Sequence, residues 1–119
     1  ADGGTRCASV TGGFIALMLA ITKLKKDKLI EEIPVRDHVA AISVGVIGGK
    51  NCLDLDYSED SEADVDLNVI KTGRGGFVEI QGTAEREPFS DKQMKAMLAL
   101  ADKGIKQLIA IQKQAVGKL

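Results

Sequence analysis

Two stretches of this 119-residue chain carry side chains that could do chemistry together. The first is Gly3-Gly4-Thr5-Arg6, which stands immediately before a long apolar run. Thr5 and Arg6 fall in the first turn of the expected helix, where unpaired N–H groups and the positive end of the helix dipole attract anions. The Arg6 guanidinium can hold a phosphate through two parallel hydrogen bonds. The stretch fits an anion cradle, although Gly-Gly-Thr is also an ordinary loop leading into a helix cap.

The second stretch is acidic. Its carboxylates crowd positions 54–66 and are Asp54, Asp56, Glu59, Asp60, Glu62, Asp64 and Asp66. Asp64, Asp66 and Asn68 share one face of an expected strand, and Asp60 lies in the expected loop before it. Two carboxylates about 4 Å apart repel by roughly 4 kcal/mol at an effective dielectric of 20, which is about three pK units. Either one keeps its proton and is a general acid, or a cation such as Mg²⁺ lies between them. A solvated acidic loop is the alternative.

A long helix must position the first stretch. Apolar residues dominate from about Arg6 to Lys26, which is typical of a helix that is buried on several sides. Lysines gather at its C-terminal end, where they suit the helix dipole or could meet RNA phosphates. We expect Gly12-Gly13 to break the apolar stretch and leave a piece too short to cross a bilayer, so no membrane association is expected.

The middle of the chain predicts four strands in two hairpins, at about 41–47, 53–57, 65–69 and 77–81. Turn signals join them at Gly48-Gly49 and at the glycine-rich segment 73–76. Each of the first three strands alternates apolar and polar residues or carries one apolar face, which favours an antiparallel sheet covered on one side by helices. A final helix begins after Ser90, which forms a capping box with Gln93. The predicted fold is α+β, with the order helix, four strands, helix, and both helices on the same side.

Composition narrows the function classes. The chain is 45% hydrophobic and 28% charged, as expected of a globular domain with a real core. A net charge of −1 gives no global attraction to nucleic acid, so a polyanion would have to be held by a local patch. Cys7 and Cys52 lack metal or redox spacing, which favours reduced thiols and a cytoplasmic location.

Four motifs together resemble the bacterial RNase PH family of phosphorolytic 3′ exoribonucleases. They occur in the family's order and are ADGGTR (1–6), LDLDYSEDS (53–61), VDLN (65–68) and VEIQGTAE (78–85). The resemblance implies an RNase PH-like fold in which this chain is the C-terminal half. Residues 1–36 would then hold the phosphate-cradle motif and the terminal helix of the first domain, and residues 37–119 would form the second domain.

The resemblance also implies roles for individual residues. Gly4, Thr5 and Arg6 would bind inorganic phosphate, while Asp60 and Asp66 would serve in catalysis and in binding a divalent metal, with Mg²⁺ expected. The implied reaction is phosphate-dependent removal of 3′ nucleotides from RNA, as in the 3′ trimming of transfer RNA precursors, with release of nucleoside diphosphates. The family's hexameric ring implies a homo-oligomer.

The absent first half has consequences of its own. In the family it supplies another phosphate-binding arginine, and a separate chain could carry it. Its absence would leave an apolar flank of the first helix uncovered. Two other function classes stay open: a catalytically incomplete fragment or structural RNA-binding ring subunit, and a metal-binding module unrelated to RNA. Phosphate-dependent release of nucleoside diphosphates would separate the enzyme from both.

Overall fold

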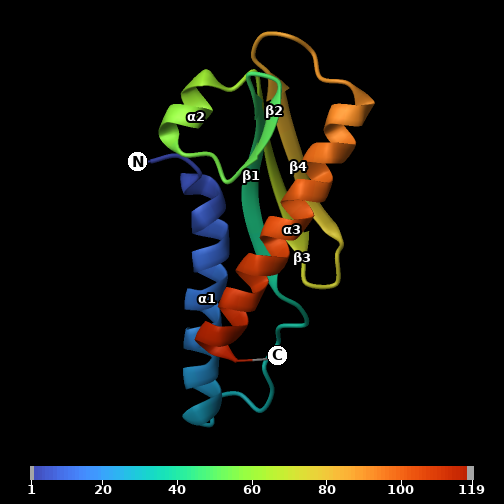
Figure 1. The fold of residues 1–119 in the computed structure, drawn as a ribbon. Coiled ribbons are helices and arrows are strands. Elements are labelled where there is room, and N and C mark those ends of the chain that lie inside the picture. The colour runs from blue at the N-terminus through green and yellow to red at the C-terminus, as the bar shows by residue number, and fades with distance from the viewer. Residues whose placement is uncertain (1, 118–119) are drawn as a thin grey trace.

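The computed structural model describes residues 2–117 and contains seven elements. They are α1 (Thr5–Lys26), β1 (Val39–Ile47), β2 (Lys50–Leu53), α2 (Tyr57–Glu62), β3 (Val65–Thr72), β4 (Phe77–Ala84) and α3 (Asp91–Val116). The strands form one antiparallel sheet in the order β2-β1-β3-β4 (Figure 1). The predicted α+β class, with two hairpins between a first and a last long helix, is therefore confirmed.

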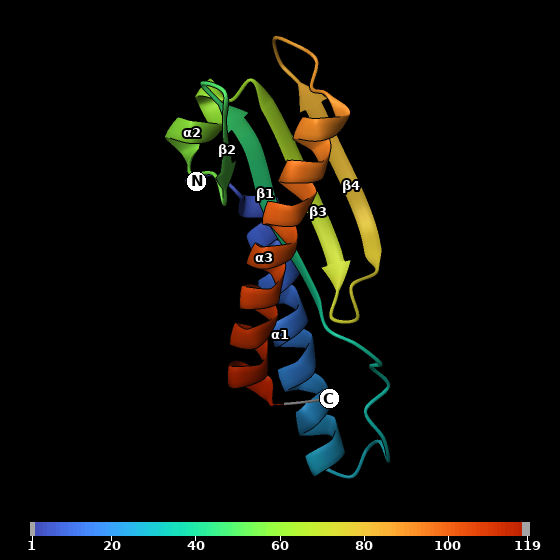
Figure 2. The ribbon, with the colours of Figure 1, turned by 45° about the vertical axis from the view of Figure 1, so that its right-hand side comes forward.

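Helix α3 lies across one face of the sheet (Figure 2), and the core lies between the two. Alternate strand residues point to the same face, so a strand with period-two apolar residues presents a continuous apolar surface. The core consists of Ala40, Ile42, Val44 and Val46 from β1, Val65, Leu67 and Val69 from β3, and Met97, Ala101, Ile105 and Ile109 from α3. The predicted capping box starts α3, because Ser90 accepts from the Gln93 N–H and Gln93 accepts from the Ser90 N–H.

The outer edge of β1 explains where α1 lies. Strand β2 pairs only with Val44–Ile47 of β1, so the first half of β1 has no strand on that side. Thr11 of α1 fills the gap: its hydroxyl accepts from the Ala41 N–H at 3.1 Å and lies 3.4 Å from the Ala41 carbonyl. Gln112 of α3 donates to the carbonyl of Val39 at 2.8 Å and to that of Thr11 at 3.1 Å.

The two long helices contact each other but pack against different parts of the sheet. Helix α3 covers the apolar face, whereas α1 runs along the β1 edge beside the C-terminal half of α3 (Figures 1 and 2). The first turn of α1 reaches the opposite face of the sheet, where Cys7 packs against Ala41 and Ile70. This placement refines the expectation that both helices cover the same side of the sheet. A pattern of apolar residues shows that a helix is buried, but it does not show whether the helix packs on a face or along an edge.

The helix expected at about 6–26 is confirmed. Helix α1 is continuous over 22 residues and runs through Gly12-Gly13, because glycine is tolerated inside a helix whose neighbours dock it by packing. The expectation that these glycines leave an apolar piece too short to cross a bilayer is wrong. By length and composition alone α1 could cross a membrane, with a mean hydropathy of 1.7. In the structure its Phe14, Met18 and Ile21 are buried, and 28% of the apolar window is buried in all.

The predicted strand at 53–57 is also wrong beyond its first residue. Strand β2 ends at Leu53, and Asp54 then takes a left-handed conformation with φ of 57°. The Asp56 side chain accepts from the Glu59 N–H and the Glu59 side chain accepts from the Asp56 N–H, which makes a capping box that starts α2. Asp60 consequently lies on a short helix instead of in a loop, because a local cap outweighed the alternating pattern.

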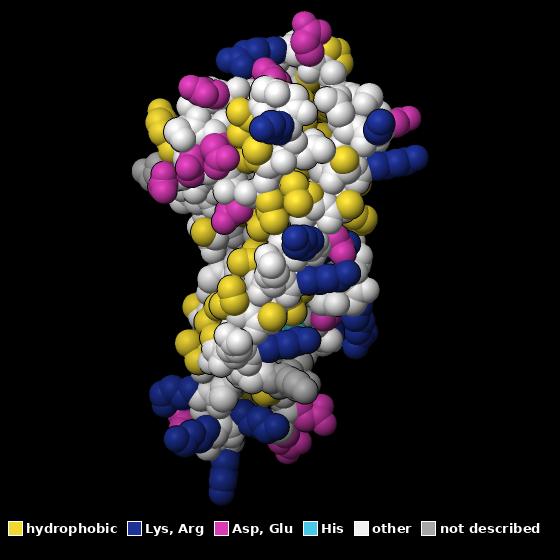
Figure 3. Space-filling view, viewed as in Figure 1, with side chains coloured by type: hydrophobic (Ala, Val, Ile, Leu, Met, Phe, Trp, Pro, Cys, Tyr) yellow, Lys and Arg dark blue, Asp and Glu magenta, His cyan; other side chains and the backbone are white. Residues whose placement is uncertain are grey.

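An apolar flank of α1 is exposed, as expected. Leu17, Leu19 and Leu24 have exposed fractions of 51%, 55% and 40%. Figure 3 shows hydrophobic side chains along this part of the molecule, with lysines below them and acidic side chains gathered over α2. The sheet and α3 of this chain leave that flank uncovered.

We predict opposite effects for two glycine substitutions near the start of α1. Gly3 has φ of 89°, and a Cβ there would lie 2.7 Å from the Leu55 carbonyl oxygen and 2.9 Å from the Tyr57 nitrogen. Gly3→Ala should therefore destabilise the protein by about 1–3 kcal/mol. Gly12→Ala should stabilise it by about 1 kcal/mol, because no described atom lies within 4 Å of that Cβ. Urea unfolding monitored by circular dichroism measures both, and equal effects would contradict the packing of Gly3.

Candidate functional site

The N-terminus of α1 is built to leave its backbone donors free. Its N-cap is Gly4, which has φ of 61° and, within residues 2–117, makes no side-chain capping bond. The first described turn also carries no acidic residue that would neutralise the dipole. The N–H groups around Thr5 and Arg6 therefore point outward at the positive end of a 22-residue helix, as the anion-cradle interpretation requires.

Close packing brings the acidic stretch to this helix end. The backbone of Leu55–Tyr57 passes directly against Gly3, where only a hydrogen in place of a side chain fits. Ser43 of β1 holds the same segment, since its hydroxyl accepts from the Leu55 N–H at 3.0 Å and its carbonyl accepts from the Asp54 N–H at 2.8 Å. These contacts fix α2, and with it Asp60, next to the first turn of α1.

A small polar cavity of about 130 Å³ forms where these segments meet. It is lined by Gly4, Thr5, Arg6, Cys7, Ser43, Asp60, Asp66 and Asn68. The cavity thus brings together all five predicted site residues, from α1, α2 and β3. A larger, mainly apolar cavity of about 270 Å³ shares Gly4 and Cys7 with it and is lined by Asp54, but by neither Asp60 nor Asp66.

Asp66 is strongly perturbed. Partial burial, followed by the negative charge of Asp60 and a hydrogen bond to its carboxyl group, raises the pKa of Asp66 to about 6. Glu85 adds a smaller effect in the same direction. The two aspartates are therefore close enough to share a proton, as two neighbouring carboxylates do when nothing else separates their charges. Asp64, two residues earlier, instead pairs with Arg86 at 2.9 Å and does not line the cavity.

The same two carboxylates are the residues that could hold a metal ion. In the described part of the chain no three His, Cys, Asp or Glu side chains form a ready-made metal cage. Mg²⁺ does not need one, because it is commonly held by one or two carboxylates together with waters and substrate phosphates. A pair of carboxylates that repel each other in a polar cavity beside an anion cradle fits that donor set.

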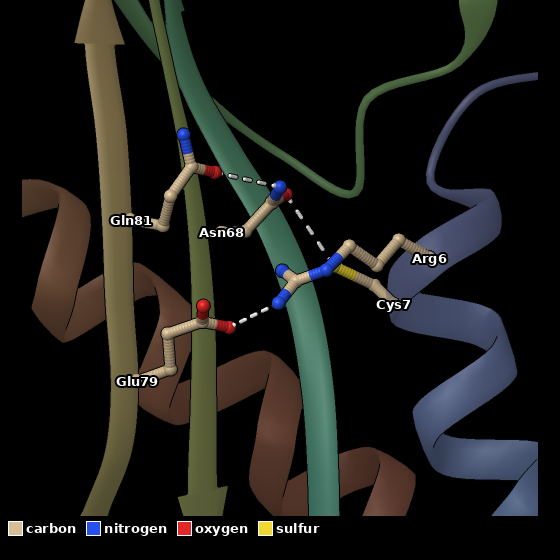
Figure 4. A network of polar contacts seen from close by, with 5 residues as sticks. All are labelled: Arg6, Cys7, Asn68, Glu79 and Gln81. Atoms are coloured by element: carbon tan, nitrogen blue, oxygen red, sulfur yellow. Dashed lines mark hydrogen bonds and ion pairs between the residues drawn. The ribbon is translucent and has the colours of Figure 1, made fainter.

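Arg6 reaches across the sheet to a partner that the sequence interpretation missed. Its Nη2 lies 2.5 Å from Oε2 of Glu79 on β4 (Figure 4). Nearby, the Cys7 thiol lies 3.4 Å from Oδ1 of Asn68, and the Asn68 amide donates to Gln81 at 3.2 Å. Burial raises the pKa of Cys7, so its sulfur stays a neutral thiol that can donate to Asn68.

The pairing of β3 with β4 explains this polar surface. Asp66 stands opposite Thr83, Asn68 opposite Gln81, and Ile70 opposite Glu79, so these positions share the face turned away from α3. The alternation of Glu79, Gln81 and Thr83 was the available signal in the sequence. This alternation indicated that the three side chains share one face of β4. Only the position of α1 shows that Arg6 lies over that face.

Comparison with known proteins identifies the family. The family model described as "3′ exoribonuclease family, domain 2" matches residues 37–104. The chain is 59% identical over 117 residues to the Ribonuclease PH of Syntrophomonas wolfei subsp. wolfei, a match that covers 98% of this chain and 49% of that relative. It therefore spans about half the length of that curated protein.

A solved structure supports the fold. A chain of an archaeal exosome core superposes with a TM-score of 0.56 over 70% of this chain and 32% of that one, at 18% sequence identity. At that identity the likeness concerns the fold alone. The family model, in contrast, matches more than half of the sequence. The chain therefore belongs to the 3′ exoribonuclease family and contains its second domain.

Proposed function

We propose that the complete protein is a phosphate-dependent 3′-to-5′ exoribonuclease. The observation that carries the proposal is the convergence of Gly4, Thr5, Arg6, Asp60 and Asp66 on one cavity at an uncapped helix N-terminus. A helix N-terminus and an arginine suit inorganic phosphate, and a carboxylate pair suits the charge changes of phosphoryl transfer. The Ribonuclease PH relative supports the assignment of RNA as the substrate.

The proposed reaction needs no covalent enzyme intermediate. The N–H groups and the side chains of Thr5 and Arg6 hold inorganic phosphate, and one of its oxygens attacks the phosphorus of the last phosphodiester in the RNA. A new P–O bond forms while the bond to the 3′ oxygen of the preceding nucleotide breaks. The products are a nucleoside diphosphate and an RNA shorter by one nucleotide. The residues act by positioning and by electrostatic stabilisation.

The two aspartates act on the leaving side. The 3′ oxygen that departs needs a proton, and Asp66 can supply one because a pKa of about 6 keeps part of it protonated near neutral pH. Asp60, as a carboxylate, accepts the hydrogen bond of that proton. After the 3′ oxygen has taken the proton, Asp66 is reprotonated through solvent by the proton that the attacking phosphate loses. In the alternative arrangement Asp60 and Asp66 are both ionised and would hold Mg²⁺ in place of the shared proton, and the ion would supply charge neutralisation to the phosphate oxygens.

The charges of the cavity indicate that this half is incomplete. Its described lining contains one cation, Arg6, against the carboxylates of Asp60 and Asp66, and Arg6 is already paired with Glu79. A phosphate dianion entering this cavity would meet excess negative charge, so further cations must come from Mg²⁺ and from the other half of the protein. The exposed flank of α1 at Leu17 and Leu19 supports a protein contact on that side.

The wider proposal follows the family. It comprises trimming of transfer RNA precursors, a homo-oligomeric ring of six subunits, and a cytoplasmic location. A catalytically inactive ring subunit is the second candidate. Intact Arg6, Asp60 and Asp66 in one cavity favour the enzyme over it, because a subunit that only binds RNA has no need of a carboxylate pair beside an anion cradle.

Asp60→Asn and Asp66→Asn should each lower the rate of phosphorolysis by the complete protein by about 10²–10⁴-fold while leaving the fold intact. The measurement is release of nucleoside diphosphates from a short RNA in the presence of Mg²⁺ and phosphate. Asp64→Asn is the matched control, because Asp64 pairs with Arg86 outside the cavity and its variant should keep most activity. Near-normal rates in both cavity variants would exclude the proposed roles.

The raised pKa of Asp66 predicts a pH-dependent stability difference. In metal-free buffer, between about pH 4 and pH 6, Asp66 is protonated in the folded state but already ionised in the unfolded chain. Rising pH should therefore lower the melting temperature of the wild type relative to Asp66→Asn across this range, with a constant difference above about pH 7. Mg²⁺ at pH 8 should recover the wild type more than the variant. A difference that is independent of pH would contradict the perturbation.

The isolated 119-residue chain should bind phosphate weakly and should not degrade RNA. The reason is the excess of carboxylates over cations around Arg6 in this half. Isothermal titration with phosphate and an RNA degradation assay test the chain alone, and addition of the N-terminal half as a separate chain should restore activity. Full activity without that addition would show that the cavity described here is complete.

A further inference from the structure

Glu79 lies where it can control the direction of the Arg6 guanidinium. The two residues are 73 positions apart in the chain, and their side chains approach from α1 and from β4 across the open face of the sheet (Figure 4). Both are partly exposed, at 55% for Arg6 and 34% for Glu79. The ion pair is therefore accessible to a ligand and is not part of the core.

The contact leaves much of the guanidinium available. A guanidinium has five N–H donors in a rigid plane, and the contact with Glu79 uses Nη2. Arg6 also lines the 130 Å³ cavity, whereas Glu79 does not. One side of the guanidinium is thus anchored outside the cavity, while Arg6 itself borders the space between Thr5 and Asp66 that we assign to phosphate.

We propose that Glu79 is a positioning residue that holds Arg6 in the orientation needed to bind inorganic phosphate. This inference rests on the proposed function of the cavity. An arginine on a helix surface has many rotamers, and binding is weaker when the anion must order the side chain by itself. The ion pair with Glu79 orders Arg6 before phosphate arrives. Glu79 touches neither the RNA nor the phosphate in this scheme.

A competing effect makes the inference testable. The negative charge of Glu79 also lowers the positive potential near Arg6 and, taken alone, would weaken phosphate binding. Removal of the Glu79 side chain therefore weakens phosphate binding if its main effect is to orient Arg6, and strengthens phosphate binding if its main effect is its negative charge. Glu79→Gln separates them, because glutamine keeps the length and an oxygen acceptor for the Arg6 N–H but has no charge.

The experiment compares the KM for phosphate in variants of the complete protein. Glu79→Ala should raise this KM by about fivefold to tenfold, the size of one lost hydrogen bond, with little change in kcat or in the KM for RNA. Glu79→Gln should recover most of the loss. Glu87→Ala, which removes an exposed carboxylate from the connection between β4 and α3, is the control for net charge and should behave as wild type.

A double variant links the effect to Arg6. In an Arg6→Ala background, Glu79→Ala should have no further effect on the KM for phosphate, because there is no guanidinium left to orient. An unchanged or lower phosphate KM in Glu79→Ala, or a loss that persists in the Arg6→Ala background, would overturn the inference. If Arg6→Ala itself leaves the phosphate KM unchanged, the proposed phosphate site fails, and this result is distinguishable from failure of the Glu79 inference alone.

Discussion

The outer edge of β1 is the constraint on which the arrangement of this chain depends. Polar backbone groups of Val39, Ala41 and Ser43 face away from β3 at positions that the short strand β2 does not reach. Buried backbone groups need partners, and each finds one outside the sheet. Gln112 of α3 serves Val39, Thr11 of α1 serves Ala41, and the Asp54 N–H serves Ser43. Three separate segments are thereby held along one edge.

This edge also creates the site. The segment after β2 and the N-terminus of α1 are both fixed to the outer side of β1, and they meet where Gly3 leaves no room for a side chain. Helix α2 then presents Asp60 toward Asp66, which comes from the neighbouring strand β3. A helix end that attracts anions and a pair of carboxylates that attracts cations become the two sides of one small cavity. Phosphoryl transfer uses both kinds of group.

The parts of the fold that the sequence predicted share one property: their signals are local. Period-two apolar residues, paired glycines at 48–49 and the capping box at Ser90 each act within a few positions, and each prediction held. The strand expected at 53–57 failed because the Asp56–Glu59 cap is also local and is stronger than a short alternation. The helix expected at about 6–26 held despite Gly12-Gly13, because the docking of α1 at Thr11, Phe14 and Met18 stabilises the helix through this weak point.

At the site, too, local signals could be predicted from the sequence and long-range contacts could not. Gly4, Thr5, Arg6, Asp60 and Asp66 were found from motifs and from a family resemblance. Strand alternation predicted that Asp60 lies near Asp66, but residue spacing did not show that this pair meets the start of α1. Glu79 was missed because its partner Arg6 is 73 residues away and approaches from a helix at the far edge of the sheet. The edge contacts of α1 that place Arg6 there depend on Thr11 and Gln112, which no motif marks.

In the proposed reaction, inorganic phosphate held at the start of α1 is the nucleophile. Tracing an isotope tests this role most directly. The complete protein would be incubated with a short RNA, Mg²⁺ and ³²P-labelled inorganic phosphate, and the released nucleotides would be separated by chromatography. The account predicts label in the β-phosphate of nucleoside diphosphates, and loss of that label in Arg6→Ala. Release of unlabelled nucleoside monophosphates at the same rate without phosphate would show hydrolysis and would contradict the account.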